Sequence, residues 1–319
     1  MMRKVLITGG LGYLGGRLAQ FLASQKSYEI FLGSRRQTQS PSWLPQAKVV
    51  RTYWDSPRDL QEICSDADTI VHLAGMNAQD CAADPAAAME VNAAATTRLL
   101  QAAIRQRVKR FIFMSTAHIY GSPLTGAITE ETKPTPIHPY ALSHKAGEDA
   151  VLASHQIGEM AGIVIRLSNA YGAPVDRDVN CWMLLVNDLC RQAATSGRLV
   201  LRSAGLQKRD FISLHDVVRA IKHFIDHHVD KYGDGIFNLG AEATYRIIDL
   251  TELIARRCEV VLGYRPEIER PDPVPGESYP ELNYKINKLK KTGFSLNGNI
   301  ENEIDVTLRF CYKKFNELT

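Results

Sequence analysis

The sequence lacks the features that mark membrane, secreted and nucleic-acid-binding proteins. No stretch approaches the ~20 consecutive apolar residues of a membrane span. No cleavage site follows the first apolar run at residues 5–7, as a secretory signal requires. The net charge is only +3 over 319 residues, which is too small to favour nucleic acid as a partner. We therefore expect a cytoplasmic protein with a small-molecule substrate, no nucleic acid partner and no membrane association.

Cysteine is scarce and scattered. None of the six cysteines stands in a Cys-x-x-Cys pair, and the histidines do not group with them. Zinc sites need such spacing, so we expect no metal. Isolated cysteines in an enzyme-sized chain without a secretory signal are typical of free thiols in a reducing cytosol.

The sequence does contain a glycine-rich run near its start, Thr8-Gly-Gly-Leu-Gly-Tyr-Leu-Gly15. An apolar segment typical of a buried strand precedes the run, and an amphipathic helix pattern follows over Leu14–Leu22. In this context, glycines let a pyrophosphate approach the free N–H groups of a helix N-terminus. The alternative is an ordinary glycine-rich turn. The sequence predicts a dinucleotide site formed by Gly9, Gly12, Tyr13, Leu14 and Gly15.

Strand and helix patterns alternate through the first half of the chain. Two of the predicted helices cover Ala86–Gln106 and Tyr140–His155. The alternation predicts an α/β protein with a Rossmann-type, doubly wound parallel sheet, whose ligands lie beyond the carboxyl ends of the strands. The predicted strands are Lys4–Thr8, Ile30–Gly33, Lys48–Tyr53, Thr69–Leu73, Arg110–Ser115 and Gly162–Leu167.

The pattern changes after residue 168. A loop over 169–180 is followed by a helical stretch at Trp182–Ser196, short strands at Arg198–Arg202 and Gly235–Leu239, and a proline-rich loop at Pro266–Pro280. We predict a dinucleotide-binding domain at 1–167 plus parts of about 213–240. The remainder of 168–319 is predicted to form a smaller, partly interleaved C-terminal domain that binds the substrate.

The second predicted strand is followed by Ser34-Arg35-Arg36 and by no acidic residue. An acid at this place binds the ribose 2′-hydroxyl of NAD, whereas an arginine accommodates the 2′-phosphate of NADP. We therefore favour NADP(H), with Ser34 and Arg35 at the phosphate, and keep NAD(H) as possible. The alternative is a pair of solvated surface arginines.

Residues after the third and fourth predicted strands are further candidates for the cofactor site. Asp55 offers an acceptor to the adenine amino group, although an aspartate at such a place is often only a turn residue. The segment Leu73-Ala74-Gly75 is small enough for the backbone to pass close to the cofactor.

Two further motifs, Ser115-Thr-Ala-His-Ile-Tyr-Gly121 and Pro139-Tyr-Ala-Leu-Ser-His-Lys-Ala-Gly-Glu148, accompany the glycine run. Together they resemble the extended short-chain dehydrogenase/reductase family, specifically its nucleotide-sugar epimerases, dehydratases and ketoreductases. The resemblance implies that Thr116 and Tyr140 hydrogen-bond the sugar, and that Tyr140 moves a proton while nicotinamide moves a hydride. It also implies a homodimer formed through the helices near 86–106 and 140–155. Further matching segments are Asn92, 166–172, 209–212, 215–216 and 237–240.

The chain departs from the family at His144, where the family has a lysine that lowers the tyrosine pKa and holds the nicotinamide ribose. Three interpretations follow. His144 replaces the lysine with a changed pH profile, which we favour; or Lys145 reaches the site from a distorted helix; or the protein binds cofactor with weak turnover. Lys145 stands about 140° from Tyr140 around the helix, whereas His144 stands about 40° away. A histidine stabilises a tyrosinate electrostatically only when it is protonated.

The pair Ala117-His118 bears on the reaction, because the resembling 4,6-dehydratases carry an Asp-Glu pair there that eliminates water. Its absence argues against a dehydratase. By resemblance to 3,5-epimerase/reductases, His118 is a proton-transfer candidate, with a polar residue lining the sugar pocket as the alternative. Cys181 lies near the place of a second acid/base in those enzymes, with a buried free cysteine as the alternative.

The cofactor preference favours an NADPH-dependent reductase of a 4-keto nucleotide sugar over a 4-epimerase that acts by transient oxidation. A cofactor-binding regulatory protein is a further alternative. The resemblance places Arg209 at the phosphates of a nucleotide-diphosphate sugar, to which arginine is suited, with a paired surface arginine as the alternative. It also implies a substrate contact for Asn169. A family arginine expected just before Pro275-Gly276 is missing, and Arg270 is a candidate replacement.

Overall fold

The computed structural model describes residues 2–36, 39–227, 232–276 and 279–316. Its centre is a seven-stranded sheet in the order β11-β7-β5-β4-β1-β2-β3, with every pair parallel. This confirms the predicted α/β, Rossmann-type sheet. The order reverses between β1 and β4, and ligands of such sheets bind at this point. The strands are β1 (Arg3–Thr8), β2 (Tyr28–Ser34), β3 (Lys48–Arg51), β4 (Thr69–His72), β5 (Arg110–Thr116), β7 (Ala161–Leu167) and β11 (Ile236–Leu239).

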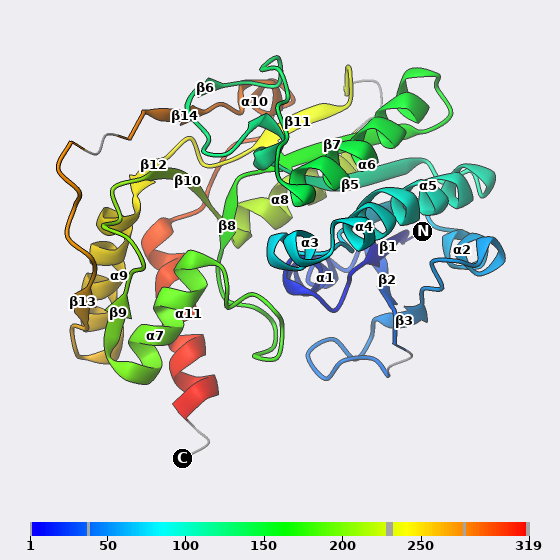
Figure 1. Ribbon diagram of the computed structural model, residues 1–319. Helices are drawn as coiled ribbons and strands as arrows, with labels where there is room; N and C mark the ends of the chain where they lie inside the picture. Colours follow the sequence, from blue (N-terminus) through cyan, green and yellow to red (C-terminus); the bar gives the residue numbers. More distant parts are fainter. Residues whose placement is uncertain (1, 37–38, 228–231, 277–278, 317–319) are drawn as a thin grey trace.

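Helices cover both faces of the sheet because successive residues of its buried strands point to opposite sides. Val5 and Ile7 face a core with α1 (Tyr13–Ala23) and α8 (Leu214–Asp226). Leu6 faces a second core, formed with α2 (Pro57–Cys64), α5 (Ala95–Arg105) and α6 (Pro139–Gln156). Figure 1 shows α5 and α6 together on one side of the sheet.

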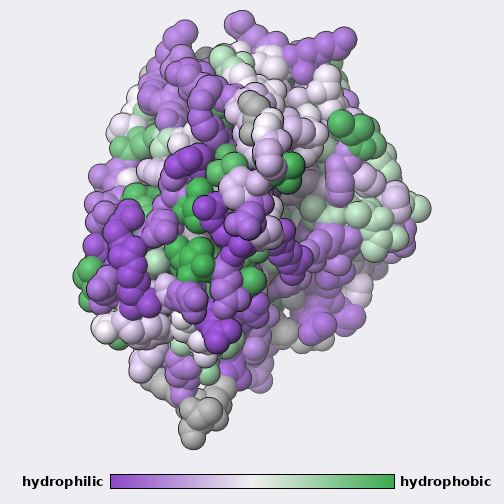
Figure 2. All heavy atoms as spheres, turned by 60° about the vertical axis from the view of Figure 1, so that its left-hand side comes forward, coloured by the Kyte–Doolittle hydropathy of each residue, from purple (hydrophilic) through white to green (hydrophobic). Residues whose placement is uncertain are grey.

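A separate core lies in the C-terminal part of the chain. Helices α7 (Leu185–Ser196), α9 (Ile247–Leu262) and α11 (Ile300–Asn316) pack together there, to the left of the large sheet in Figure 1. Three small sheets accompany them: β12-β10-β8, β13-β9 and β14-β6. The surface on this side is mostly hydrophilic, with apolar side chains in small groups (Figure 2). The strands are β6 (Gly126–Ile128), β8 (Asn169–Tyr171), β9 (Arg198–Val200), β10 (Lys208–Ser213), β12 (Thr244–Arg246), β13 (Glu267–Glu269) and β14 (Leu282–Tyr284).

Four predicted elements differ from the structure. The loop expected over 169–180 begins with strand β8, which pairs with β10. The helix expected over 86–106 consists of α4 (Pro85–Met89), a π-helical turn η1 (Glu90–Ala94) and α5. The helix expected from residue 182 begins at Leu185. The proline-rich segment contains strand β13, which pairs with β9, while its residues 277–278 lie outside the described part.

The remaining short elements are α3 (Ala78–Ala83), the 3-10 helix η2 (Ala117–Tyr120) and α10 (Asn287–Lys291). Among the helices that the structure describes, none combines the length and the apolar content needed to cross a membrane.

Candidate active site

The glycine-rich turn joins β1 to α1 at the point where the strand order reverses. Gly9 has a φ of +67°, and a Cβ there would lie 2.8 Å from the Ala74 nitrogen. A Cβ on Gly15 would lie 2.3 Å from the Gly9 oxygen. Gly12 precedes the helix without a side-chain cap, so the first N–H groups of α1 have no side-chain acceptor at that position. The turn therefore fits a pyrophosphate.

Tyr13 and Leu14 turn their side chains away from the turn. The Tyr13 hydroxyl donates to the Gly172 oxygen at 2.9 Å, and Leu14 packs against the core between the sheet and α1. These two residues can therefore offer a dinucleotide their backbone N–H groups, while their side chains hold α1 in place.

The adenosine end of the predicted site lies beyond β2 and β3. Ser34 ends β2, and its hydroxyl accepts a hydrogen bond from the Arg36 N–H at 3.2 Å. Arg35 is exposed beside it. Asp55 is 93% exposed and forms an ion pair with Arg98 at 3.4 Å. This exposed, ion-paired arrangement is that of a turn residue. It agrees with the alternative to an adenine contact that we gave for Asp55.

Asn92 holds the segment after β4 in place. Its Oδ1 accepts the Met76 N–H at 2.8 Å, and its Nδ2 donates to the Ser143 hydroxyl at 3.0 Å. Asn92 is buried, and its amide accepts one hydrogen bond and donates another. It therefore positions the Leu73-Ala74-Gly75 backbone against α6. Asn92 lies in the π-helical turn, a feature that often marks functional sites.

Thr116 and Tyr140 lie together as the sequence predicts for a catalytic pair. Thr116 ends β5, and Tyr140 is in the first turn of α6. Their hydroxyl groups are close enough for Thr116 to affect the pKa of Tyr140. Burial raises the pKa of Tyr140 to about 12, with the Cys81 thiol acting in the same direction and Thr116 opposing both. Tyr140 is therefore protonated near neutral pH.

His144 lies one helical turn from Tyr140, with their ring centroids 4.3 Å apart. Its Nδ1 is 2.8 Å from the Tyr140 carbonyl oxygen; since a carbonyl only accepts, Nδ1 carries the proton. Burial lowers the pKa of His144 to about 4, so the ring is neutral near pH 7 and Nε2 is an acceptor. This Nε2 is 3.9 Å from where a Cβ on Gly75 would stand. His144 thus presents an acceptor, without a positive charge.

Lys145 points elsewhere. It forms an ion pair with Asp149 on the outer side of α6. This geometry contradicts the interpretation in which Lys145 replaces the family lysine.

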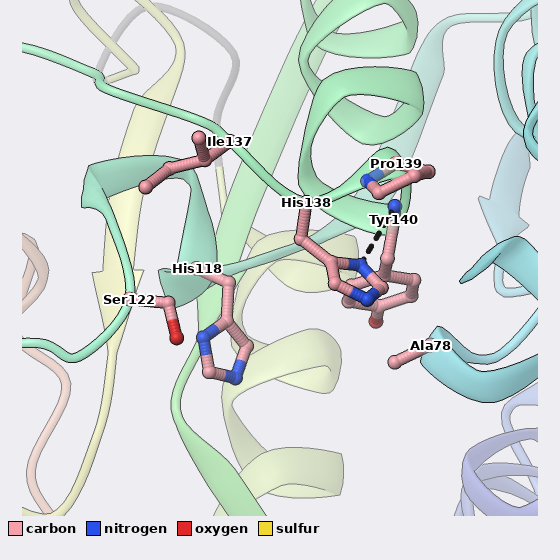
Figure 3. Close-up of a pocket in the computed structure, with 7 residues that line it drawn as sticks. All are labelled: Ala78, His118, Ser122, Ile137, His138, Pro139 and Tyr140. Carbon is pink, nitrogen blue, oxygen red and sulfur yellow. Dashed lines mark hydrogen bonds between the residues drawn. The ribbon is translucent and has the colours of Figure 1, made fainter.

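A cavity of about 450 Å³ opens beside Tyr140. His118 comes from η2, whereas His138 and Tyr140 come from the start of α6, and all three rings lie around the cavity in Figure 3. His118 keeps solvent-exposed surface at the cavity. The protein around its ring nevertheless desolvates the charged form and lowers its pKa, with the charges of Arg209 and His138 acting in the same direction. The cavity fits a small polar ligand within reach of Tyr140. It is lined by Ala78, His118, Ser122, Ile137, His138, Pro139 and Tyr140, none of them acidic.

His138 is a site residue that our sequence analysis missed. Its Nδ1 accepts the Tyr140 N–H at 3.2 Å, which caps the N-terminus of α6 (dashed in Figure 3). The sequence signal was Pro139, because proline favours the first helical position and the preceding residue is then the cap.

Asn169 and Arg209 come from neighbouring strands of the C-terminal part. Asn169 on β8 donates to the Asp210 carbonyl at 2.9 Å. Arg209 on β10 is exposed and close enough to His118 to affect its pKa. The Arg270 guanidinium donates to the Ala204 carbonyl at 2.6 Å. The Arg270 guanidinium is therefore engaged by a backbone carbonyl.

Cys181 requires a correction. Its side chain is fully buried, and burial raises the pKa of its thiol to about 11. It is not among the residues that line the cavity. These observations match the alternative of a buried free cysteine. The prediction of an acid/base or substrate contact at Cys181 therefore fails, because the thiol is neither accessible nor readily ionised.

Comparisons with known proteins agree with this geometry. The family model described as "NAD dependent epimerase/dehydratase family" matches residues 5–240. A dTDP-glucose 4,6-dehydratase of Streptomyces niveus is 26% identical over 269 residues, covering 80% of this chain and 77% of its own. A UDP-glucose 4-epimerase structure from Thermotoga maritima, with UDP-glucose, has a TM-score of 0.81 at 22% identity, covering 98% and 99% of the two chains. The RMD structure from Pseudomonas aeruginosa, complexed with NADPH, has a TM-score of 0.79 at 22% identity, with the same coverage.

Proposed function

The chain belongs to the NAD-dependent epimerase/dehydratase family and is therefore an enzyme, and from this premise we propose that it reduces the 4-keto group of a nucleotide-linked sugar. The reaction converts a ketone into a hydroxyl group. NADPH, when bound along the glycine-rich turn, supplies the hydride. Tyr140 supplies the proton to the ketone oxygen, and Thr116 orients that oxygen by hydrogen bonding.

The placement of Thr116 and Tyr140 beside the cavity carries this proposal, and burial that favours the protonated Tyr140 hydroxyl supports it. A reductase needs a proton donor at the ketone. An epimerase must first remove a proton from a hydroxyl group, for which the tyrosine has to be ionised. Burial keeps the pKa of Tyr140 at about 12, and the neutral His144 adds no cation to lower it. The Tyr140 hydroxyl is therefore better suited to donating a proton than to accepting one.

The other predicted site residues have roles that follow from their positions. We assign Gly9, Gly12 and Gly15 to the pyrophosphate and the His144 Nε2 to a ribose hydroxyl. His118 faces the cavity and is assigned to the sugar. Arg209 is assigned to the diphosphate, since a guanidinium binds phosphate oxygens in pairs. Further assignments to the dinucleotide are the backbone of Tyr13, Leu14, Leu73, Ala74 and Gly75, with Ser34 and Arg35 at the 2′-phosphate.

The choice of NADPH rests on the end of β2. Arg35 stands where NAD-binding relatives need an acid, which supports binding of a phosphate. Among the structural neighbours, RMD is complexed with NADPH, whereas a UDP-glucuronic acid 4-epimerase from Bacillus cereus is in complex with NAD.

The test is to mix the protein with NADPH and 4-keto nucleotide sugars and to follow the absorbance of NADPH. Consumption of NADPH in step with formation of a reduced sugar supports the proposal. Interconversion of 4-hydroxy epimers without net consumption would show an epimerase instead. Cofactor binding with no turnover on any such sugar would favour the regulatory alternative.

Substitutions at His144 should change the pH dependence of reduction. A lysine there places a cation one turn from Tyr140 and lowers the pKa of the hydroxyl by roughly 1–3 units. The wild-type rate should stay level on the alkaline side because the pKa of Tyr140 is about 12. In His144→Lys, the rate should fall at a lower pH, where Tyr140 loses its proton. The measurement is kcat against pH from 6 to about 10.5.

Lys145→Ala is the matched control, because Lys145 is paired with Asp149 outside the site. Its pH profile should follow that of the wild type. An inactive Lys145→Ala enzyme beside an active His144→Ala enzyme would overturn the assignment of His144.

A further inference from the structure

The carboxyl ends of β2 and β3 bring together residues that are well separated in the sequence. Ser34 and Arg51 are direct partners in the register of the two parallel strands. The Thr52 N–H donates to the Ser34 oxygen at 2.8 Å. Side chains at paired positions point to the same face of a sheet, so Arg51 stands beside Ser34 on the side to which Ser34 points.

Arginines gather here without acidic partners. Arg35, Arg36 and Arg51 are all exposed. Within the parts of the chain that the structure describes, none of the three forms an ion pair with a carboxylate, although Arg98 nearby pairs with both Asp55 and Glu90. Unneutralised guanidinium groups in one place attract a multiply charged anion.

Arg51 is also held in position. Its guanidinium lies over the Tyr53 ring, 4.5 Å from the ring centroid. Stacking of this kind orients the planar group and reduces the entropy lost when it binds an anion. Arg35, by contrast, was chosen only for its position in the sequence after the second strand.

A buried hydroxyl at the same strand end lacks a partner. Thr52 is 4% exposed, and its Oγ1 has no hydrogen bond. The oxygen lies 3.0 Å from where a Cβ on Gly33 would stand, so the missing side chain leaves it room. An unsatisfied buried hydroxyl costs free energy, and each such group in a folded protein calls for an explanation. Because Thr52 follows Arg51 in an extended segment, its hydroxyl points to the opposite face of the sheet, toward the vacant side of Gly33, and is not part of the arginine group.

We propose that Arg51, supported by Tyr53, forms with Arg35 a two-arginine site for the 2′-phosphate of NADPH. This inference rests on the proposed use of NADPH and adds the residues that select it. A phosphate monoester carries a charge of about −1.5 to −2 near neutral pH, so two guanidinium groups match it better than one. NADH has a hydroxyl at this place and gains little from either arginine.

The test is the binding affinity of Arg51→Gln for NADPH and for NADH, followed by quenching of protein fluorescence without any sugar substrate. We expect the Kd for NADPH to rise about 10- to 100-fold, since hydrogen bonds to charged groups contribute on the order of 1.5–3 kcal/mol. The Kd for NADH should stay within about twofold. Arg51→Lys keeps the charge but loses the planar group over Tyr53. Its Kd for NADPH should lie between those of the wild type and Arg51→Gln.

Arg58→Gln is the matched control, because it removes an exposed arginine of α2 and the same single charge. It should leave both affinities unchanged. A wild type that prefers NADPH, with Arg51→Gln affecting neither cofactor or both equally, overturns the two-arginine site alone. A wild type that binds NADH more tightly overturns the choice of NADPH in the proposed function, and the site with it.

Discussion

Replacing Tyr140 by phenylalanine is expected to lower the kcat of ketone reduction by about 10²–10⁴-fold, the usual contribution of a positioned general acid. The ring remains and only the hydroxyl is lost, so the packing against His144, with ring centroids 4.3 Å apart, stays in place. Thr116 is left without the neighbouring hydroxyl. The measurement is the initial rate of NADPH consumption at saturating sugar, together with the Kd for NADPH by fluorescence.

The Kd for NADPH should change little, because the glycine-rich turn and the arginines lie apart from the hydroxyl. Tyr312→Phe, on the exposed side of α11, serves as the control and should keep full activity. If Tyr140→Phe retains more than a tenth of the wild-type rate, another group supplies the proton. His138 would then be the first candidate, since its ring faces the same cavity.

Removing the Glu148 carboxylate is expected to destabilise the folded protein by about 3–5 kcal/mol, the cost of breaking a buried ion pair from one side. Glu148 on α6 binds Arg166 on β7 at 2.7 Å, with side chains 0% and 2% exposed. In Glu148→Ala the guanidinium remains buried without its counter-ion. The measurement is the urea midpoint of unfolding.

Neighbouring side chains extend this ion pair into a network. The Arg166 guanidinium also donates to the Tyr120 hydroxyl at 2.9 Å, which in turn donates to the Asn238 oxygen at 2.7 Å. Tyr120 belongs to η2, the short helix that carries His118. We therefore expect Glu148→Ala to lower activity as well, at temperatures where the protein remains folded.

Asp149→Ala is the control for Glu148→Ala, one residue further along the helix. Its ion pair with Lys145 is exposed to water, and such pairs contribute about 0–1 kcal/mol. Equal losses of stability in the two variants would contradict a special role for the buried pair.

The sequence was sufficient for the architecture and for those site residues that a local motif determines. The glycine run needed only its flanking strand and helix to be placed at the turn between β1 and α1. Thr116 and Tyr140 followed from short motifs at the end of a strand and the start of a helix. In each case the motif itself was a local pattern, although the contacts that it makes, such as that of Gly9 with Ala74, reach across the sheet.

Residues that depend on distant contacts could not be read in this way. The place of Arg51 beside Ser34 follows from the register of two strands, which is set by the packing of the whole sheet. The neutral state of His144 follows from burial, and burial of one side chain is a property of the folded chain. The same holds for Cys181, which is fully buried and whose neighbours include Asn187 of α7.

The pairing of β6 with β14 has a consequence for the order in which the protein matures. Gly126 pairs with Leu282, so the strand that follows η2 finds its partner only after some 150 further residues have been made. A ribosome synthesises the whole parallel sheet, including β11, before it reaches β14. The strands of the parallel sheet can therefore pair during translation, whereas the strand pair β6–β14 and the packing of Ile286, Leu289 and Phe294 into the core beside α1 and α8 form near the end of synthesis. A nascent chain halted before residue 282 should therefore lack both the β6–β14 pair and one edge of the core behind the glycine-rich turn.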